Sequence, residues 1–371
     1  MILYRLKLEN FRNYARSEVL FHHGMNVLFG QNGQGKTNIL ESIYYLALTK
    51  SFRSSNDRNL IHYRQTYFRV EGEFKTVQGR VWKSAIAYSP DKGKRLMVNG
   101  EKITKFSEYI GRIPVVLLAP GDLEISQSGP AHRRRFLDIL LSQAGKLYLH
   151  HLVEYRRSLR QRNTILQEET SNPALLESWD EALIEHGVGL MEKRQEAVQF
   201  LDEWVKKYYR ELSGREDRVK IVYQSSVKWD GTDSPAEAFR QALRQQRQRE
   251  LALQMTTVGP HRDDLLFLLN GKPLRAVGSQ GEHKTFVIAL KLAEIQYLRQ
   301  MQSEPPILLF DDIFGELDEQ RIGNMVRSLT QIGQVFITTT SPDFFGKLPH
   351  WQEPASFYRI EAGQIQEALS T

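Results

Sequence analysis

The residues best suited to chemistry form one short run near the N-terminus, Gly30-Gln31-Asn32-Gly33-Gln34-Gly35-Lys36-Thr37. This run matches G-x-x-x-x-G-K-[ST] at every fixed position, which is the pattern of a phosphate-binding loop. Glycines are needed because backbone N–H groups must wrap a phosphate closely, in conformations that a Cβ obstructs. Lys36 supplies a positive charge for the β- and γ-phosphates, and Thr37 supplies a hydroxyl ligand for Mg²⁺. The run therefore predicts a binding site for ATP and Mg²⁺.

The sequence on both sides of the loop fits this prediction. The apolar strand pattern Met25–Phe29 runs into the glycines, and apolar residues at helical spacing follow over Asn38–Leu48. Such a helix would direct the positive end of its dipole at the bound anion. The predicted nucleotide-binding residues of this segment are Gly30, Asn32, Gly33, Gly35, Lys36, Thr37 and Asn38.

A second, acidic element completes this kind of site. A magnesium–nucleotide site requires a buried strand that ends in a carboxylate, and Ile307–Phe310 followed by Asp311 and Asp312 provides one. Asp311 would hold the metal, mostly through water, together with Thr37. Asp312 would polarise the attacking water. Lys36, Asp311 and Asp312 are therefore the predicted catalytic residues.

These two elements lie far apart, since Asp311 follows Lys36 by 275 positions. Small kinases and GTPases place their second carboxylate much closer, so the gap indicates a head that is split by an insertion. Strand and helix patterns alternate at both ends of the chain, whereas a charged, helix-periodic stretch runs from about Ala131 to Leu212. We expect an α/β fold with a mainly helical inserted arm. The expected parts are an N-terminal head segment (1–120), the helical arm (121–250) and a C-terminal head segment (251–371).

The composition is that of a globular protein long enough for two domains. The chain has 371 residues, of which 41% are hydrophobic and 25% are charged. No apolar run approaches the roughly 20 residues of a membrane span, and the early charges argue against a signal peptide. The absence of cysteine excludes disulfides, thiolate metal sites and cysteine nucleophiles. We expect a cytoplasmic protein without a membrane partner.

Positive charge is concentrated in two segments of the chain, whose formal net charge is +6. Residues 131–165 contain eight Lys or Arg and two acidic residues, and residues 240–249 contain four arginines and no acidic residue. Two interpretations remain open, a solvated helix face and a surface for a polyanion such as nucleic acid.

Other strings resemble known families. Ser279-Gln280-Gly281-Glu282, at the start of a predicted helix, resembles the signature motif of ABC-type ATPases, and Gly315-Glu316-Leu317-Asp318 resembles their D-loop. The sequence as a whole resembles the RecF family, bacterial recombination mediators related to Rad50 and SMC heads, from about residue 1 to about residue 345. The strings that carry this resemblance are LENFRNY (8–14), KSFR (50–53), GPAHRRRFLD (129–138) and GPHRDD (259–264).

The resemblance implies an ABC-type head and several further roles. Arg12 and Asn13 would reach the bound phosphates, and Arg53 would add positive charge near the nucleotide. Ser279 and Gly281 would contact the γ-phosphate held by a second copy of the chain, so that ATP binding produces a homodimer. From the residues alone, Ser279 could equally be an ordinary N-cap.

The resemblance also implies a role on DNA. The chain would bind single-stranded, gapped and duplex DNA without sequence specificity and act with RecR and RecO. It would promote recombinase loading in DNA repair, in replication-fork restart and in the SOS response, and would be associated with the nucleoid. The candidate DNA-binding residues are Arg133, Arg134, Arg156 and Arg160.

One departure from related ATPases bears on the rate of hydrolysis. ABC transporters carry a histidine after the strand that follows the D-loop, and the residues here are Thr338-Thr339-Thr340-Ser341. We therefore expect a slow Mg-dependent ATPase that acts as a switch. Two alternatives stay open, a nucleotide-switched scaffold with negligible hydrolysis and the ATPase subunit of a transporter. A head with a long coiled coil is disfavoured because the insertion is short.

Overall fold

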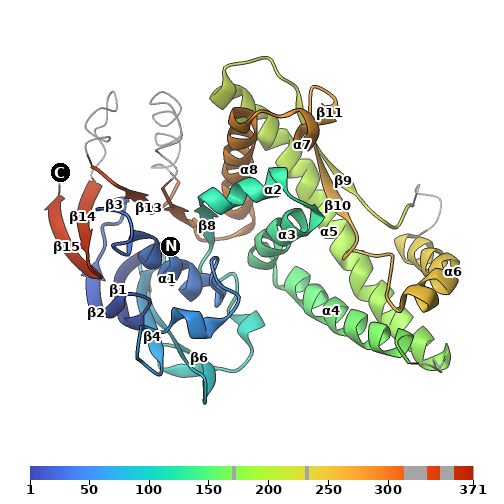
Figure 1. Cartoon of the computed structure of the whole chain (residues 1–371), viewed down its shortest axis with the longest axis horizontal. Coiled ribbons are helices and arrows are strands. Elements are labelled where there is room, and N and C mark those ends of the chain that lie inside the picture. The colour runs from blue at the N-terminus through green and yellow to red at the C-terminus, as the bar shows by residue number, and fades with distance from the viewer. Residues whose placement is uncertain (169–172, 230–233, 313–331, 343–354, 371) are drawn as a thin grey trace. The chain divides into compact units, whose positions relative to one another are not determined.

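The computed structural model describes residues 1–168, 173–229, 234–312, 332–342 and 355–370. The chain divides into two compact units (Figure 1). The first unit combines Met1–Asp122 with Glu294–Thr371, and the second is Leu123–Ala293. None of the helices in the described part of the chain combines the length and apolar character needed to cross a bilayer.

One antiparallel sheet of the first unit has six strands in the order β2-β1-β4-β5-β6-β7. Side chains alternate between its two faces, as in β4, where Phe68, Val70 and Phe74 are buried and the charged residues between them are partly exposed. The strands are β1 (Ile2–Phe11), β2 (Tyr14–Leu20), β4 (Phe68–Lys75), β5 (Val81–Ser89), β6 (Gly93–Val98) and β7 (Glu101–Ile103).

The second sheet of this unit has the order β15-β14-β3-β13-β12-β8, and its five strands from β14 to β8 run parallel. Strands β12 and β8 are buried at every position, which explains their continuous apolar sequences. Its strands are β3 (Met25–Phe29), β8 (Val115–Leu118), β12 (Ile307–Phe310), β13 (Val335–Thr339), β14 (Ala355–Glu361) and β15 (Gln364–Ser370).

Helix α1 (Lys36–Leu48) lies between the two sheets, since it contacts β4 and β5 of one sheet and β8 and β13 of the other. Eleven of its thirteen residues are buried, as expected for a helix covered on all sides. Short 3₁₀ turns η1 (Asp57–Leu60), η2 (Phe106–Glu108) and η3 (Pro120–Leu123) complete the connections. Because β3, β12 and β13 are parallel, the residues that follow them meet at one edge of the sheet, at the start of α1.

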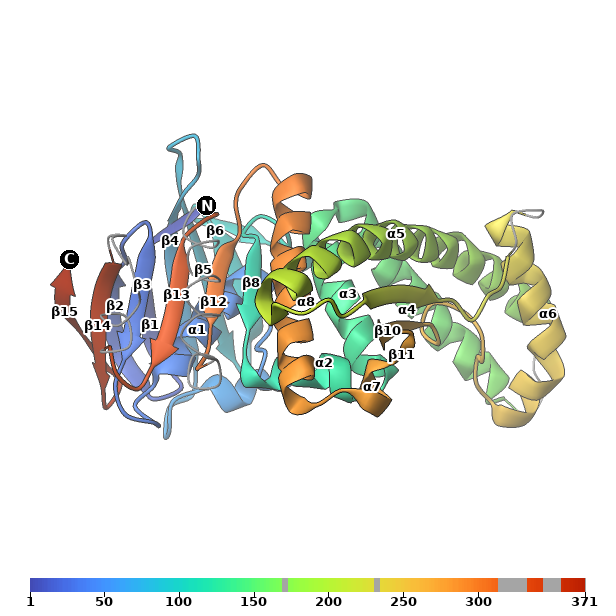
Figure 2. The same cartoon turned by 90° about the horizontal axis from the view of Figure 1, so that it is seen from above.

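The second unit is mainly helical. Its longest helix, α5, packs against α4, α6 and strand β9 (Figure 2). A three-stranded sheet of order β11-β10-β9 completes it. Its elements are α2 (Glu124–Gln127), α3 (Pro130–Ala144), α4 (Lys146–Leu166), α5 (Pro173–Ser213), β9 (Val219–Gln224), α6 (Pro235–Leu253), β10 (Asp264–Leu269), β11 (Lys272–Pro273), α7 (Leu274–Val277) and the first part of α8 (Gln280–Met301).

The compact units differ from the parts expected from the sequence at one boundary. The first boundary falls after Asp122, close to the expected residue 120. The second boundary falls after Ala293, whereas the C-terminal head segment was expected to begin at residue 251. The reason is that β10 pairs with β9 and packs against α3, so that this strand belongs to the insertion.

Candidate nucleotide site

The loop between β3 and α1 has the backbone conformation that its glycines predict. Gly30, Gly33 and Gly35 all have positive φ angles, of 148°, 83° and 116°. A Cβ on Gly30 would lie 2.4 Å from the carbonyl oxygen of Ile360, and one on Gly35 would lie 2.6 Å from the Asn13 amide nitrogen. A side chain at Gly30 is therefore opposed by a backbone contact as well as by backbone strain, whereas at Gly35 it would have the same strain and would displace the Asn13 side chain.

Lys36, the first residue of α1, is folded back over the loop. Its Nζ donates to the carbonyl oxygens of Gly30, at 2.5 Å, and Gln31, at 2.9 Å. Burial lowers the pKa of Lys36, while the carboxylates of Asp312 and Asp311 act in the opposite direction. The ammonium group thus donates to two neutral carbonyl oxygens. A phosphate oxygen would replace them as the acceptor and form a stronger, charge-assisted hydrogen bond.

Asp311 links the loop to the central strands. Its Oδ1 accepts from the Thr37 hydroxyl at 2.8 Å and from the Thr338 hydroxyl at 2.9 Å. The residue is only 7% exposed, and burial raises its pKa, although both hydroxyl contacts counteract this shift. Strand β12 thus brings Asp311 to the first turn of α1.

The Asp311 environment fits a magnesium ion by its chemistry. Thr37 and Asp311 offer hard oxygen donors side by side, which is what Mg²⁺ prefers. Within the described residues there is no cluster of three or more acidic, His or Cys side chains that could enclose a metal. Most ligands would therefore have to come from phosphate and water, as is usual for magnesium bound with a nucleotide.

Asp312 is exposed beside this pair. Its backbone has a φ of 50°, and its amide donates to the Thr338 hydroxyl at 2.9 Å. Thr338 therefore contacts both acidic residues. In the sequence, the segment 338–341 had stood out only because it lacks a histidine. The Thr338 hydroxyl donates to Asp311 and accepts from the Asp312 amide, so it links the two acidic residues.

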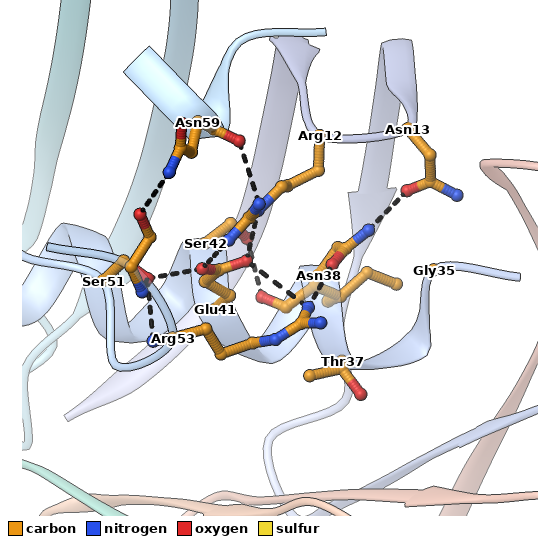
Figure 3. Close-up of polar contacts among 12 residues, drawn as sticks. Arg12, Asn13, Gly35, Thr37, Asn38, Glu41, Ser42, Ser51, Arg53 and Asn59 are labelled. Atoms are coloured by element: carbon orange, nitrogen blue, oxygen red, sulfur yellow. Dashed lines mark hydrogen bonds and ion pairs between the residues drawn. The ribbon is translucent and has the colours of Figure 1, made fainter. Parts of the chain in front are cut away.

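The turn between β1 and β2 places Arg12 and Asn13 at the start of α1 (Figure 3). The Asn13 amide donates to the Gln34 carbonyl oxygen at 2.8 Å, and its Oδ1 accepts from the Asn38 amide at 2.8 Å. The Arg12 guanidinium binds the carboxylate of Glu41. Asn13 therefore lies against the loop and Arg12 against helix α1, through Glu41, which has no counterpart among the sequence predictions.

A second contact missed from the sequence comes from the C-terminal hairpin. In the turn between β14 and β15, the Ala362 amide donates to Gln34 Oε1 at 2.7 Å and the Gly363 amide donates to the Gln34 carbonyl oxygen at 3.2 Å. Both turn residues have positive φ, 48° and 73°. Gly363 between two alternating runs was the available signal for this hairpin.

Ser279 and Gly281 lie in the second unit, at the start of α8. Ser279 forms a capping box with Glu282, because its hydroxyl accepts from the Glu282 amide at 3.3 Å and its own amide donates to the Glu282 carboxylate at 2.7 Å. The hydroxyl also donates to this carboxylate at 2.8 Å, so the carboxylate accepts two hydrogen bonds from Ser279. These two hydrogen bonds lower the pKa of Glu282. The space next to the Gly281 Cα, where a Cβ would lie, is open. Both residues are exposed at a helix N-terminus, and the D-loop string 315–318 lies outside the described residues.

The four candidate DNA-binding arginines differ in their surroundings. Arg133 does not meet the expectation, because it is 6% exposed and its guanidinium forms a bidentate pair with Asp264 at 2.7 and 2.9 Å. Arg134 is half-buried and donates to the Asp263 carbonyl oxygen. Arg156 and Arg160 are exposed on α4, and Arg156 pairs with Asp138 at 2.8 Å. Only these last two present their charge to solvent.

Comparison with known proteins identifies relatives along the whole chain. Residues 2–362 match the RecF/RecN/SMC N-terminal domain family. The chain is 39% identical over 369 residues to the DNA replication and repair protein RecF of Streptococcus suis strain 05ZYH33, covering 99% of this chain and 100% of the relative.

Solved structures agree with this result. The recombination mediator protein RecF-ATP of the RecFOR pathway superposes with a TM-score of 0.91 at 31% identity, over 99% of this chain and 98% of the other. An Smc head bound to the C-terminal winged-helix domain of ScpA superposes with a TM-score of 0.58 at 14% identity, over 100% and 98%. The fold is therefore that of an ABC-type ATPase head, as the sequence predicts.

Proposed function

The chain belongs to the RecF family of DNA replication and repair proteins, and from this premise we propose that it is an ATP-dependent, DNA-binding recombination mediator. It binds ATP and Mg²⁺ in the head, dimerises on ATP and holds DNA at single-strand gaps. Slow hydrolysis then releases the DNA. The proposal includes RecR and RecO as partners and recombinase loading as the outcome, in repair, fork restart and SOS induction.

The observation that carries this proposal is the contact between Thr37 and Asp311. Their oxygen atoms lie 2.8 Å apart, although the two residues are 274 positions apart in the sequence. The contact joins the phosphate-binding loop to an acidic strand end at the carboxyl edge of a parallel sheet, which is where α/β folds bind nucleotides. The solved structure of RecF-ATP from the RecFOR pathway shares the fold over nearly the full length of the chain.

Each residue of the site has a definite task in this proposal. Lys36 exchanges its two carbonyl acceptors for phosphate oxygens, and the loop amides surround the phosphate. Thr37 and Asp311 would hold Mg²⁺, which would supply positive charge to neutralise the phosphates. Asp312, which is exposed, accepts a hydrogen bond from the attacking water and orients it. Hydrolysis is slow because the segment 338–341 supplies hydroxyls where related enzymes have an imidazole.

The nucleotide site is completed by a second copy of the chain. Ser279 and Gly281 of one copy would face the γ-phosphate held by the other, with the N-terminus of α8 directed at the anion. The Ser279 hydroxyl is exposed and is held only by the nearby Glu282 within the described residues, so it can turn to a phosphate. Arg156 and Arg160, with a contribution from the half-buried Arg134, would bind DNA phosphates in the arm.

The direct test measures equilibrium binding of ATP with and without Mg²⁺, and the rate of its hydrolysis. We expect tight binding that requires Mg²⁺ and a turnover well below roughly 1 s⁻¹. Lys36→Met should lose binding, and Asp312→Asn should bind ATP but not hydrolyse it. Absence of ATP binding by the wild-type protein refutes the proposal. Unmeasurable turnover with intact binding would instead support the nucleotide-switched scaffold.

A further inference from the structure

We propose that Glu41 is a positioning residue of the nucleotide site, which holds the arginines Arg12 and Arg53 at the start of α1 so that they can meet the phosphates. The inference rests on the proposed binding of ATP. It assigns a function to a buried acidic residue next to a site for a polyanion, where a negative charge by itself should be unfavourable.

Glu41 is an unusual residue for its place in the fold. It lies on α1 one turn after Thr37 and is fully buried. Removing a carboxylate from water costs several kcal/mol, so a buried carboxylate persists only where partners satisfy it. Its partners are close, since Arg12 donates to its two oxygens at 2.8 and 2.7 Å and Ser51 donates to Oε1 at 2.5 Å.

The grip on Arg12 is bidentate, which fixes the plane of the guanidinium as well as its position. A third contact joins Arg12 Nη1 to the carbonyl oxygen of Asn59 at 2.9 Å. Arg12 itself keeps 20% of its side chain exposed. The guanidinium is therefore held by Glu41 and by the Asn59 carbonyl oxygen (Figure 3), while part of the Arg12 side chain remains exposed.

Glu41 also reaches Arg53, and from there a chain of contacts leads to the loop. Arg53 Nη1 lies 3.8 Å from Glu41 and donates to Asn38 Oδ1 at 2.9 Å. The Asn38 amide donates to Asn13, which donates to the Gln34 carbonyl oxygen of the loop. The segment with Arg53, the start of α1 and the turn between β1 and β2 thus share one network, and Glu41 is the only acidic residue among those labelled in Figure 3.

The charges explain why a carboxylate is needed. Arg12 and Arg53 both approach the same Glu41 carboxylate, and without it two like charges would repel each other across a short distance. A single carboxylate leaves the group with a net positive charge for the phosphates while it fixes both cations. Positioning and simple electrostatics therefore predict opposite results when the Glu41 charge is removed.

The test compares the affinity for Mg–ATP of the wild type with Glu41→Gln, Arg12→Ala and the double variant. Simple electrostatics predicts that Glu41→Gln strengthens binding of the anion, because a negative charge is lost. We expect instead a loss of about tenfold, the size of one lost charge-assisted interaction. In the Arg12→Ala background the same substitution should cost less affinity than in the wild type, because only the contact of Glu41 with Arg53 is then left to lose.

Glu250→Gln provides a matched control in the second unit. Glu250 is also fully buried, and it pairs with Arg162 at 2.6 Å and accepts from the Thr257 amide at 2.7 Å. Its substitution should lower thermal stability to an extent similar to Glu41→Gln but leave the affinity for ATP unchanged. A general effect of losing a buried ion pair would lower the affinity in both variants.

The outcomes separate this inference from the function on which it rests. If wild type does not bind ATP, the proposed function fails. If wild type binds and folded Glu41→Gln binds equally well or more tightly, the positioning role is refuted, as it is if the loss persists undiminished in the Arg12→Ala background. Should Glu41→Gln not fold, Glu41→Asp keeps the buried charge but shortens its reach, and must still weaken ATP binding.

Discussion

At the scale of the residue, the buried Asp311 carboxylate lowers the stability of the ligand-free protein, and a bound cation would reverse this effect. Its carboxylate is buried and accepts two hydroxyl hydrogen bonds, yet burial outweighs them and raises its pKa. A folded-state pKa above the unfolded value means that stability is lost as the pH rises through the folded pKa. Near pH 7 the ionised Asp311 therefore destabilises the ligand-free protein, and a bound cation would relieve this cost.

Asp311→Asn should accordingly stabilise the ligand-free protein. Asparagine keeps an oxygen for Thr37 and Thr338 but carries no charge to bury, so the free energy of unfolding at pH 7 should rise by about 0.5–2 kcal/mol. Binding of ATP should no longer depend on Mg²⁺. Denaturant unfolding measures the first effect, with Asp312→Asn, at an exposed position, as the control that stays near wild type. A destabilised Asp311→Asn protein would contradict this account of the carboxylate.

At the scale of elements, the hairpin of β14 and β15 holds the phosphate-binding loop in place through hydrogen bonds from its turn. Its turn residues Ala362 and Gly363 both donate to Gln34, and the Cβ of any residue at 363 would lie 2.3 Å from the Asn13 carbonyl oxygen. The turn therefore packs against both the loop and the turn between β1 and β2. The loop depends on a segment more than 300 positions away in the sequence.

Gly363→Ala should therefore weaken ATP binding as well as stability. The added methyl must displace the Asn13 backbone, in addition to adopting an unfavourable φ of 73°. Gly100→Ala isolates the second effect, because Gly100 has a φ of 86° in the turn between β6 and β7 with nothing near its Cβ position. Both variants should lose about 1 kcal/mol from the backbone, and only Gly363→Ala should also lose several-fold in affinity for ATP, measured by titration. Equal affinities would show that the hairpin does not position the loop.

The sequence predicted the local elements of the site well and its long-range contacts poorly. Strand β3, helix α1 and strand β12 follow from apolar runs bounded by glycines or acids, and the fold class and family are confirmed by the comparisons. The pairing of β10 with β9 was not predictable, because an alternating run does not reveal its partner strand. Arg133 shows the same limit, since a count of charges does not indicate that its guanidinium is buried against Asp264.

On the scale of the whole molecule, the arginines of the arm divide into structural and exposed groups, and this division predicts different phenotypes. Arg160 is exposed, and within the described residues no carboxylate pairs with it. Arg160→Ala should lower affinity for gapped DNA and reduce the slope of log affinity against log salt by about one. Arg133→Ala should instead destabilise the protein by about 3–5 kcal/mol, because it leaves Asp264 unpaired. A salt series on both variants distinguishes them, and an unchanged slope for Arg160→Ala would remove this residue from the DNA surface.

The central claim is that the loop at Gly30–Thr37 forms half of a site that a second copy completes. Sedimentation velocity with and without Mg–ATP tests it most directly, on the wild type, Lys36→Met, Ser279→Arg and the control Ser107→Arg, which places the same charge at an exposed position of η2. We predict a monomer without nucleotide and a dimer with ATP for the wild type and Ser107→Arg, and monomers under both conditions for Lys36→Met and Ser279→Arg. A dimer that forms without nucleotide and is indifferent to Ser279→Arg would contradict the claim.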